Sequence, residues 1–219
     1  MIQLTFNQLF NLFEQEYGMA SHKQWWPFDT VYEMVIGAIL VQNTTWSNTE
    51  KSLARLREHT AFLPDKIRAL SQSELITLIH SSGFQQNKSH NILAFFDWLA
   101  LHQDDFDAIQ RQYGSQLRQT LLKQRGIGPE TADAILLYAF KEPVFIADTY
   151  ARRLFDKLNA PVPLTYAAVK EFAETNGTLS VEQWSALHGW IIQFAQQHLK
   201  PKQTWENNFL VGKELIVSK

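Results

Sequence analysis

Apolar residues recur along much of the chain at spacings of three and four positions, the period of an α-helix with one buried face. The first such segment is Leu4 to Tyr17, with apolar side chains at positions 6, 9, 10, 13 and 17. The same period predicts later helices over 48–58, 87–101, 104–113, 115–124, 131–140, 150–158 and 184–199. Strand character is confined to 145–147 and 215–217, so we expect an all-α fold.

One predicted helix is apolar on every side. The range Val31 to Val41 has almost no polar residue, which is typical of a helix buried at the centre of a domain. It leads directly into the polar run Gln42 to Thr45, followed by Trp46. Amides, hydroxyls and an indole at the end of a buried helix indicate one wall of a ligand pocket.

Several helix starts are marked by capping sequences. The spacing of a capping box, in which the first and fourth residues bond each other's backbone amides, occurs in Thr30 to Glu33, Ser71 to Glu74 and Ser180 to Gln183. After Pro161 to Pro163, Thr165 is placed to cap the next helix. We therefore expect helices to begin at these positions.

A glycine turn separates the helices predicted over 115–124 and 131–140. Gly126 and Gly128 flank Ile127, and Pro129 follows at the first helical position, where its missing N–H costs nothing. Backbone N–H groups at such a turn can hold a phosphate, although most turns of this kind only redirect the chain. The range 108–129 contains no acid but has the cations Arg111, Arg118, Lys123 and Arg125, a pattern that favours contact with a nucleic-acid backbone.

Two further features have both a structural and a functional interpretation. Asp148 stands directly before the helix predicted over 150–158, where an aspartate is more often an N-cap than a catalytic group. Trp25 and Trp26 are adjacent outside any predicted helix. Such a pair serves equally well as the anchor of a loop and as a surface on which a ligand stacks.

Composition limits the class of protein. The chain has 219 residues, a formal net charge of −2 and no cysteine. The charge argues against indiscriminate coating of nucleic acid but permits a local basic face. Without cysteine there is no disulfide and no cysteine-held zinc or iron–sulfur centre. No apolar run reaches the ~20 residues that span a bilayer, and no signal-peptide pattern is present, so we expect a cytoplasmic protein that does not bind membranes.

Five motifs, in this order, resemble those of the helix-hairpin-helix DNA glycosylases, in particular the endonuclease III-like branch. The resemblance extends from about Trp25 to Leu199 and depends on the order and spacing of the motifs, since each one alone is a weak signal. The motifs are Leu40-Val-Gln-Asn-Thr44, Ser82-Gly-Phe-x-x-Asn-Lys-Ser-x-Asn-Ile92, Arg125-Gly-Ile-Gly-Pro-Glu-Thr-Ala132, Ala147-Asp-Thr149 with Arg153, and Leu187-His-Gly189.

The resemblance implies a fold of two helical domains with a DNA-binding cleft between them. One is a helical barrel over 24–137 that carries the hairpin, and the other is built from 1–23 together with 138–219. Asp148 matches the family's catalytic aspartate at the cleft. The partner implied is double-stranded DNA with a damaged base, bound by a monomer.

The resemblance also assigns binding residues. Those that match positions contacting a DNA phosphate are Gly126, Ile127, Gly128 and Thr131. Those placed at or near the pocket of an extruded base are Gln42, which matches the residue that fills the gap left by the base, with Trp46, Trp25 and Trp26. The hairpin carbonyl groups can in addition hold a monovalent cation, and no other metal or cofactor is expected.

Departures from the family pattern restrict the expected activity. Glu130 stands where bifunctional members have the lysine that forms a Schiff base, so we expect base removal without strand cleavage. The range 193–209 lacks the cysteines that hold the family's iron–sulfur cluster. The tail is therefore expected to be held by packing, with Trp205 and Phe209 as candidates. Ala38 replaces the glutamate of the adenine-mismatch glycosylases, which counts against that specificity.

Within the branch, the chain most resembles the 3-methyladenine DNA glycosylases. Alkylated purines are cationic and leave as neutral bases without a general acid, so base extrusion, aromatic stacking and one carboxylate suffice. We therefore expect excision of alkylated purines from duplex DNA in base excision repair. Neutral pyrimidines need more help to leave, and the sequence offers no evident acid. The alternatives are a uracil or thymine-mismatch glycosylase of the same fold, a non-catalytic helix-hairpin-helix DNA-binding protein, and a helical protein–protein adaptor.

Overall fold

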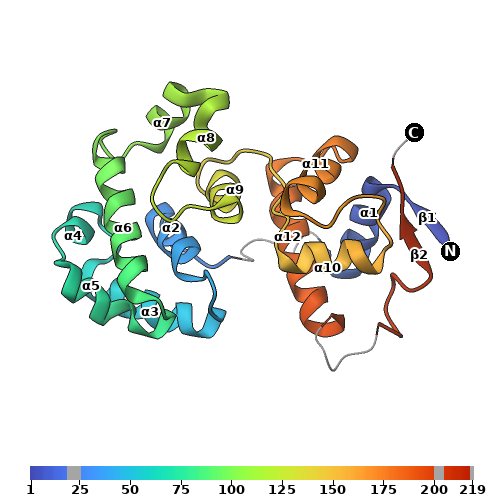
Figure 1. The fold of residues 1–219 in the computed structure, drawn as a ribbon, viewed down its shortest axis with the longest axis horizontal. Helices are drawn as coiled ribbons and strands as arrows, with labels where there is room; N and C mark the ends of the chain where they lie inside the picture. Colours follow the sequence, from blue (N-terminus) through green and yellow to red (C-terminus); the bar gives the residue numbers. More distant parts are fainter. Residues whose placement is uncertain (19–25, 200–204, 218–219) are drawn as a thin grey trace. The chain divides into compact units, whose positions relative to one another are not determined.

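The computed structural model describes residues 1–18, 26–199 and 205–217, whose regular secondary structure is almost entirely helical (Figure 1). The all-α fold is confirmed. The chain divides into two compact units, Pro27–Phe140 and the combination of Met1–Trp26 with Lys141–Lys219. Among the described residues, no helix combines the length and the apolar character needed to cross a membrane.

The unit Pro27–Phe140 is built around α2 (Val31–Leu40), which is buried from Glu33 to its end. Three helices pack against it: α3 (Trp46–Thr60), α6 (Gln85–Ala100) and α9 (Pro129–Tyr138). Each large aliphatic side chain removed from water in this way contributes ~1.5–3 kcal/mol. The other helices of this unit are α4 (Pro64–Arg68), α5 (Gln72–Ile79), the 3-10 helix η2 (His80–Ser82), α7 (Phe106–Tyr113), the 3-10 helix η3 (Gly114–Gln116) and α8 (Leu117–Leu122).

The other unit is assembled from both ends of the chain. Its helices are α1 (Phe6–Tyr17), α10 (Thr149–Lys157), α11 (Tyr166–Asn176) and α12 (Val181–His198), with α12 in contact with both α1 and α10. Aromatic rings join the tail to these helices. The ring of Phe209 lies 5.3 Å from Phe13 on α1 and 5.4 Å from Phe194 on α12, and Trp205 lies 6.0 Å from Phe194.

A small parallel sheet in this unit pairs β1 (Ile2–Leu4) with β2 (Lys213–Leu215). Of the two segments with strand character, 215–217 overlaps β2 at one residue, and the prediction at 145–147 is wrong. The apolar side chains of 145–147 are buried in the connection that leads into α10, so burial rather than strand pairing accounts for them. The helix predicted from Leu4 begins at Phe6, because Leu4 belongs to β1 and Thr5 caps α1.

The predicted caps at Ser71, Thr165 and Ser180 are confirmed. The box at Thr30 is only half formed. The Thr30 side chain accepts from the Glu33 N–H, but the Glu33 carboxylate accepts from the amide of Asp29 and pairs with Arg57 on α3. The helix thus starts where predicted, while its buried acid is neutralised by a residue distant in sequence.

Candidate functional site

The predicted hairpin joins α8 to α9 within the unit Pro27–Phe140. Gly126 has a φ of +71°, which favours glycine, and Gly128 is the N-cap of α9. In the described part of the chain, the amides of Gly126 and Gly128 donate to no acceptor. The Ile127 N–H instead donates to the Gln124 carbonyl at 3.2 Å. A phosphate contact through Ile127 therefore requires this internal bond to open, whereas the two glycine amides can donate as they stand.

Close packing is a second requirement for glycine at position 126, besides its positive φ. A Cβ at this position would lie 1.8 Å from Nδ2 of Asn91, a buried residue on α6. A Cβ at Gly128 would meet no atom within 4 Å. The steric requirement for glycine in the hairpin is thus confined to Gly126, where the side-chain amide of Asn91 lies directly against the backbone.

Gln42, in the turn after α2, is bonded to the hairpin. Its Nε2 donates to the Gly126 carbonyl at 3.1 Å and to Thr131 Oγ1 at 2.9 Å. Two residues predicted to contact DNA, Gln42 and Thr131, therefore contact each other in this structure. Movement of Gln42 toward a nucleic acid has to break both hydrogen bonds.

The cations predicted to flank the hairpin do not all face solvent. Arg118 on α8 binds Asp133 on α9 through two hydrogen bonds of 2.7 and 2.9 Å, and Asp133 is fully buried. Arg118 therefore has a structural role as the partner of a buried carboxylate, with its own side chain 31% exposed. Lys123 and Arg125 are exposed, and none of the described carboxylates forms an ion pair with either.

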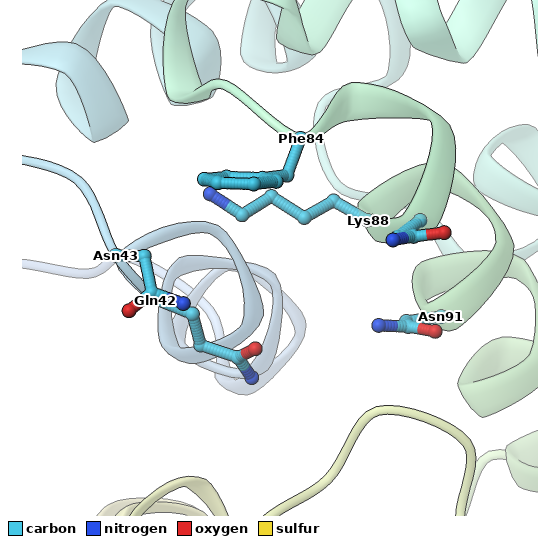
Figure 2. Close-up of a pocket in the computed structure, with 6 residues that line it drawn as sticks. Gln42, Asn43, Phe84, Lys88 and Asn91 are labelled. Atoms are coloured by element: carbon cyan, nitrogen blue, oxygen red, sulfur yellow. The ribbon is translucent and has the colours of Figure 1, made fainter.

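A hollow of about 190 Å³ opens next to Gln42 (Figure 2). Four of the six lining residues carry side-chain amides, which offer both hydrogen-bond donors and acceptors. The others are a lysine and Phe84, which is 65% exposed. The lining residues are Gln42, Asn43, Phe84, Asn87, Lys88 and Asn91. Sequence reasoning assigned a role only to Gln42, although 82–92 forms one of the five motifs.

The predicted aromatic lining of a base pocket is described only in part. Trp25 lies outside the described residues. Trp26 is half-buried at a bend in the unit that also contains Asp148. Trp46 is the first residue of α3 and is half-buried, but it does not line the hollow at Gln42.

In the other unit, Asp148 is the N-cap of α10, as predicted. Its Oδ1 accepts from the Ala151 N–H at 2.7 Å, and the residue is 7% exposed. Negative charge is stabilised at a helix N-terminus. Its second oxygen, Oδ2, faces His188. Capping through one oxygen is therefore compatible with chemistry at the other.

His188 is the residue near Asp148 that sequence reasoning missed. It lies buried on α12, with Nε2 at 3.9 Å from Asp148 Oδ2. Burial lowers the pKa of His188 to about 4, so the ring is neutral at pH 7. The sequence places His188 in the motif Leu187-His-Gly189, but only the folded structure brings its side chain next to Asp148. Among the residues that the structure describes, no three His, Asp or Glu side chains are grouped to hold a metal ion.

Comparison with known sequences identifies a family for this arrangement. Residues 36–176, more than half of the chain, match the model of the HhH-GPD superfamily of base excision DNA repair proteins. A Methanocaldococcus jannaschii protein, provisionally named a DNA repair glycosylase, is 29% identical to this chain over 210 residues. These residues make up 94% of this chain and 96% of the M. jannaschii protein. Endonuclease III of Thermotoga maritima is 26% identical over 185 residues, which are 83% of this chain and 79% of its own.

Solved structures give the same result. The crystal structure of H. pylori 3-methyladenine DNA glycosylase bound to 1,N6-ethenoadenine matches with a TM-score of 0.75 at 26% identity, over 88% of this chain and 98% of that one. A trapped covalent intermediate of endonuclease III with DNA has the same fold, with a TM-score of 0.72 at 23% identity over 92% and 91% of the two chains. This chain belongs to the HhH-GPD DNA glycosylase superfamily of base excision DNA repair proteins.

Proposed function

We propose that this protein is a monofunctional DNA glycosylase that removes alkylated purines of the 3-methyladenine type from duplex DNA. The reaction is hydrolysis of the N-glycosidic bond of an extruded nucleotide, with Asp148 as the catalytic carboxylate. The observation that carries the choice of substrate is the similarity to H. pylori 3-methyladenine DNA glycosylase, which extends over 88% of this chain. The lowered pKa of the buried His188 beside Asp148 supports the same choice.

Leaving-group chemistry connects His188 to the substrate. An alkylated purine carries positive charge on its ring. When its bond to C1′ breaks, the electron pair moves onto the base, which leaves neutral without gaining a proton. A neutral pyrimidine leaves as an anion unless an acid protonates it. A histidine with a pKa of about 4 is unprotonated at pH 7 and does not supply that proton, so the surroundings of Asp148 fit the cationic base.

Asp148 acts on the sugar in this proposal. Positive charge develops at C1′ as the base departs, and a fixed carboxylate that faces such a charge is typically worth about 100- to 1000-fold in rate. Water then attacks C1′, and its proton passes to the carboxylate and on to solvent. The hydrogen bond from Ala151 holds the carboxylate in place before the substrate arrives.

The absence of a lyase step is proposed from Glu130. This residue is exposed in the first turn of α9, at the position that matches the Schiff-base lysine of bifunctional members. A carboxylate has no amine lone pair with which to form a Schiff base at C1′. The reaction is therefore proposed to end at an abasic site with an intact strand.

A base-release assay across lesions tests the proposal. Duplexes that contain 3-methyladenine, 7-methylguanine, uracil, a thymine opposite guanine or 8-oxoguanine are incubated with the protein, and released bases are separated by chromatography. We expect release of the methylated purines alone, with strand breaks only after alkaline treatment. Faster release of uracil or thymine contradicts the proposed substrate, and DNA binding without release of any base contradicts catalysis.

A further inference from the structure

Lys88 is a buried cation in an unusual place. It lies in α6 four residues after the N-cap Phe84 and is only 3% exposed. The macrodipole of α6 disfavours positive charge at this end of the helix. Among the described residues no carboxylate pairs with it. Burial lowers the pKa of Lys88 to about 8, which leaves the ammonium as the major form at pH 7.

The Lys88 ammonium instead binds two backbone carbonyl groups. Nζ donates to the Leu40 carbonyl at 2.7 Å and to the Ser82 carbonyl at 2.7 Å. Leu40 is the last residue of α2 and Ser82 the last residue of η2. Carbonyl groups at helix ends lack partners within their own helix, so one side chain satisfies the ends of two elements that are distant in sequence.

Each of these carbonyl groups immediately precedes a turn that lines the hollow. After Leu40 come Gln42 and Asn43, the latter with a φ of +54°. After Ser82 come Gly83 and Phe84, with φ of +66° and +49°. Left-handed backbone of this kind costs of order 1–3 kcal/mol for a residue other than glycine and persists only where its surroundings impose it. Figure 2 shows the Lys88 side chain running alongside the Phe84 ring.

We propose that Lys88 is a positioning residue that fixes the turn carrying Gln42 and Asn43 against the turn carrying Phe84, so that both meet a damaged site in DNA together. The inference rests on the proposed function, because it takes these turns to face DNA. In this proposal Lys88 acts through the two backbone carbonyl groups to which its ammonium donates. Its effect is on the preference for damaged over intact DNA.

The test compares affinities rather than rates. Dissociation constants are measured for a duplex with one tetrahydrofuran abasic analogue and for the same duplex intact. Lys88→Met keeps the aliphatic stem and removes the ammonium. We expect the preference for the abasic duplex to fall about tenfold, the order of the loss of one hydrogen bond to a charged group, while affinity for the intact duplex stays within about twofold. The matched control is Lys66→Met, which removes an exposed lysine on α4 in the same unit and leaves both constants unchanged.

Chemical rescue separates positioning from a general packing defect. Because the chain has no cysteine, a Lys88→Cys variant carries a single thiol. This variant is alkylated in urea with 2-bromoethylamine and refolded, which restores an ammonium at the same distance from the backbone as in lysine. Alkylation with iodoacetamide gives a side chain that ends in a neutral amide instead. Wild-type protein that has been unfolded in urea and refolded is the reference. We expect the ammonium adduct to recover the wild-type preference for the abasic duplex, and the amide adduct not to recover it. These two adducts also replace Lys88→Met as the test if that variant does not fold.

The outcomes distinguish this inference from the proposed function. The role of Lys88 is overturned if the ammonium and amide adducts have the same preference for the abasic duplex. It is also overturned if Lys88→Met loses affinity for the abasic and intact duplexes equally. If wild-type protein releases no alkylated purine yet the preference depends on the ammonium, the role of Lys88 holds and the proposed substrate is wrong. If alkylated purines are released and the preference is unchanged by Lys88→Met, only the role of Lys88 is wrong.

Discussion

Oδ2 of Asp148 and Nε2 of His188 lie 3.9 Å apart, with both residues less than a tenth exposed. Burial lowers the pKa of His188 to about 4, so the ring that faces Asp148 is neutral at pH 7. In the proposed reaction the carboxylate of Asp148 stabilises a developing sugar cation. A permanently charged side chain in the place of His188 would weaken that effect, whereas a neutral ring does not.

Asp148→Asn tests the catalytic carboxylate. The side-chain oxygen of asparagine can still accept the Ala151 N–H, so α10 keeps its cap while the charge is lost. We expect excision of alkylated purines to fall about 100- to 1000-fold, with affinity for abasic DNA largely retained. Single-turnover excision and binding assays measure the two quantities. Asp156→Asn, which changes an exposed acid on the same helix, serves as the control.

His188 also makes the stability of the fold depend on pH. Its pKa is 6.5 when exposed and about 4 when folded, so between these values the unfolded chain binds a proton that the folded chain does not. Stability therefore falls as the pH is lowered from about 6.5 to 4, by roughly 3 kcal/mol from this group at ~1.4 kcal/mol per pH unit.

Urea unfolding of wild type and His188→Gln at pH 7 and pH 4 measures this contribution. We expect the variant to lose less stability on acidification than wild type. The same experiment on His59→Gln, which replaces an exposed histidine on α3, corrects for other groups that titrate. Identical losses in wild type and His188→Gln would show that the imidazole is not held neutral.

The two hairpin glycines should respond differently to alanine. Gly126→Ala places a methyl group inside the Asn91 side chain and strains a φ of +71°, so we expect a loss of ~1–3 kcal/mol in unfolding free energy and weaker DNA binding. Gly128→Ala meets open space at a φ of −86° and should leave the fold intact. In the double variant with Asn91→Ala, only the backbone strain remains. Full stability of Gly126→Ala alone contradicts the packing seen here.

Glu130→Lys tests whether the glutamate at this position accounts for the proposed absence of a lyase step. We expect wild-type protein to form no covalent complex with lesion DNA in the presence of borohydride, because it has no amine at this position. The Glu130→Lys variant should form such a complex, detected by its reduced mobility in denaturing gels. Glu182→Lys places a lysine in the first turn of α12 instead and is the matched control. Borohydride trapping of wild-type protein contradicts the monofunctional proposal.

The C-terminal tail depends on ring packing in a chain without cysteine. Phe209 contacts Phe13, Tyr17 and Phe194, and it is half-buried. We expect Phe209→Ala to lower the unfolding free energy by about 2 kcal/mol, less than a fully buried phenylalanine. Val211→Ala, at a residue 43% exposed in the same tail, should have little effect. Equal stability of the two variants in urea titrations would rule out this anchoring role.

Local sequence signals predicted the helical elements well. The caps at Ser71, Thr165, Ser180 and Asp148 are formed as expected, because a capping bond spans only three or four residues. The strand prediction at 145–147 failed because a short apolar run does not distinguish a buried connection from a strand. The strand β1 was missed because three residues carry too little pattern.

By itself, the sequence determined the helices, the glycine hairpin, the capping Asp148, the absence of cysteine and the glutamate at position 130. These properties depend on residue type and on neighbours within one helical turn. Only the tertiary structure decided four contacts between distant residues. Arg118 forms an ion pair with Asp133, and Gln42 donates a hydrogen bond to Thr131. Lys88 binds the backbone before two turns, and His188 faces Asp148. Those pairings depend on distances between elements far apart in the chain, which periodicity and capping rules do not encode.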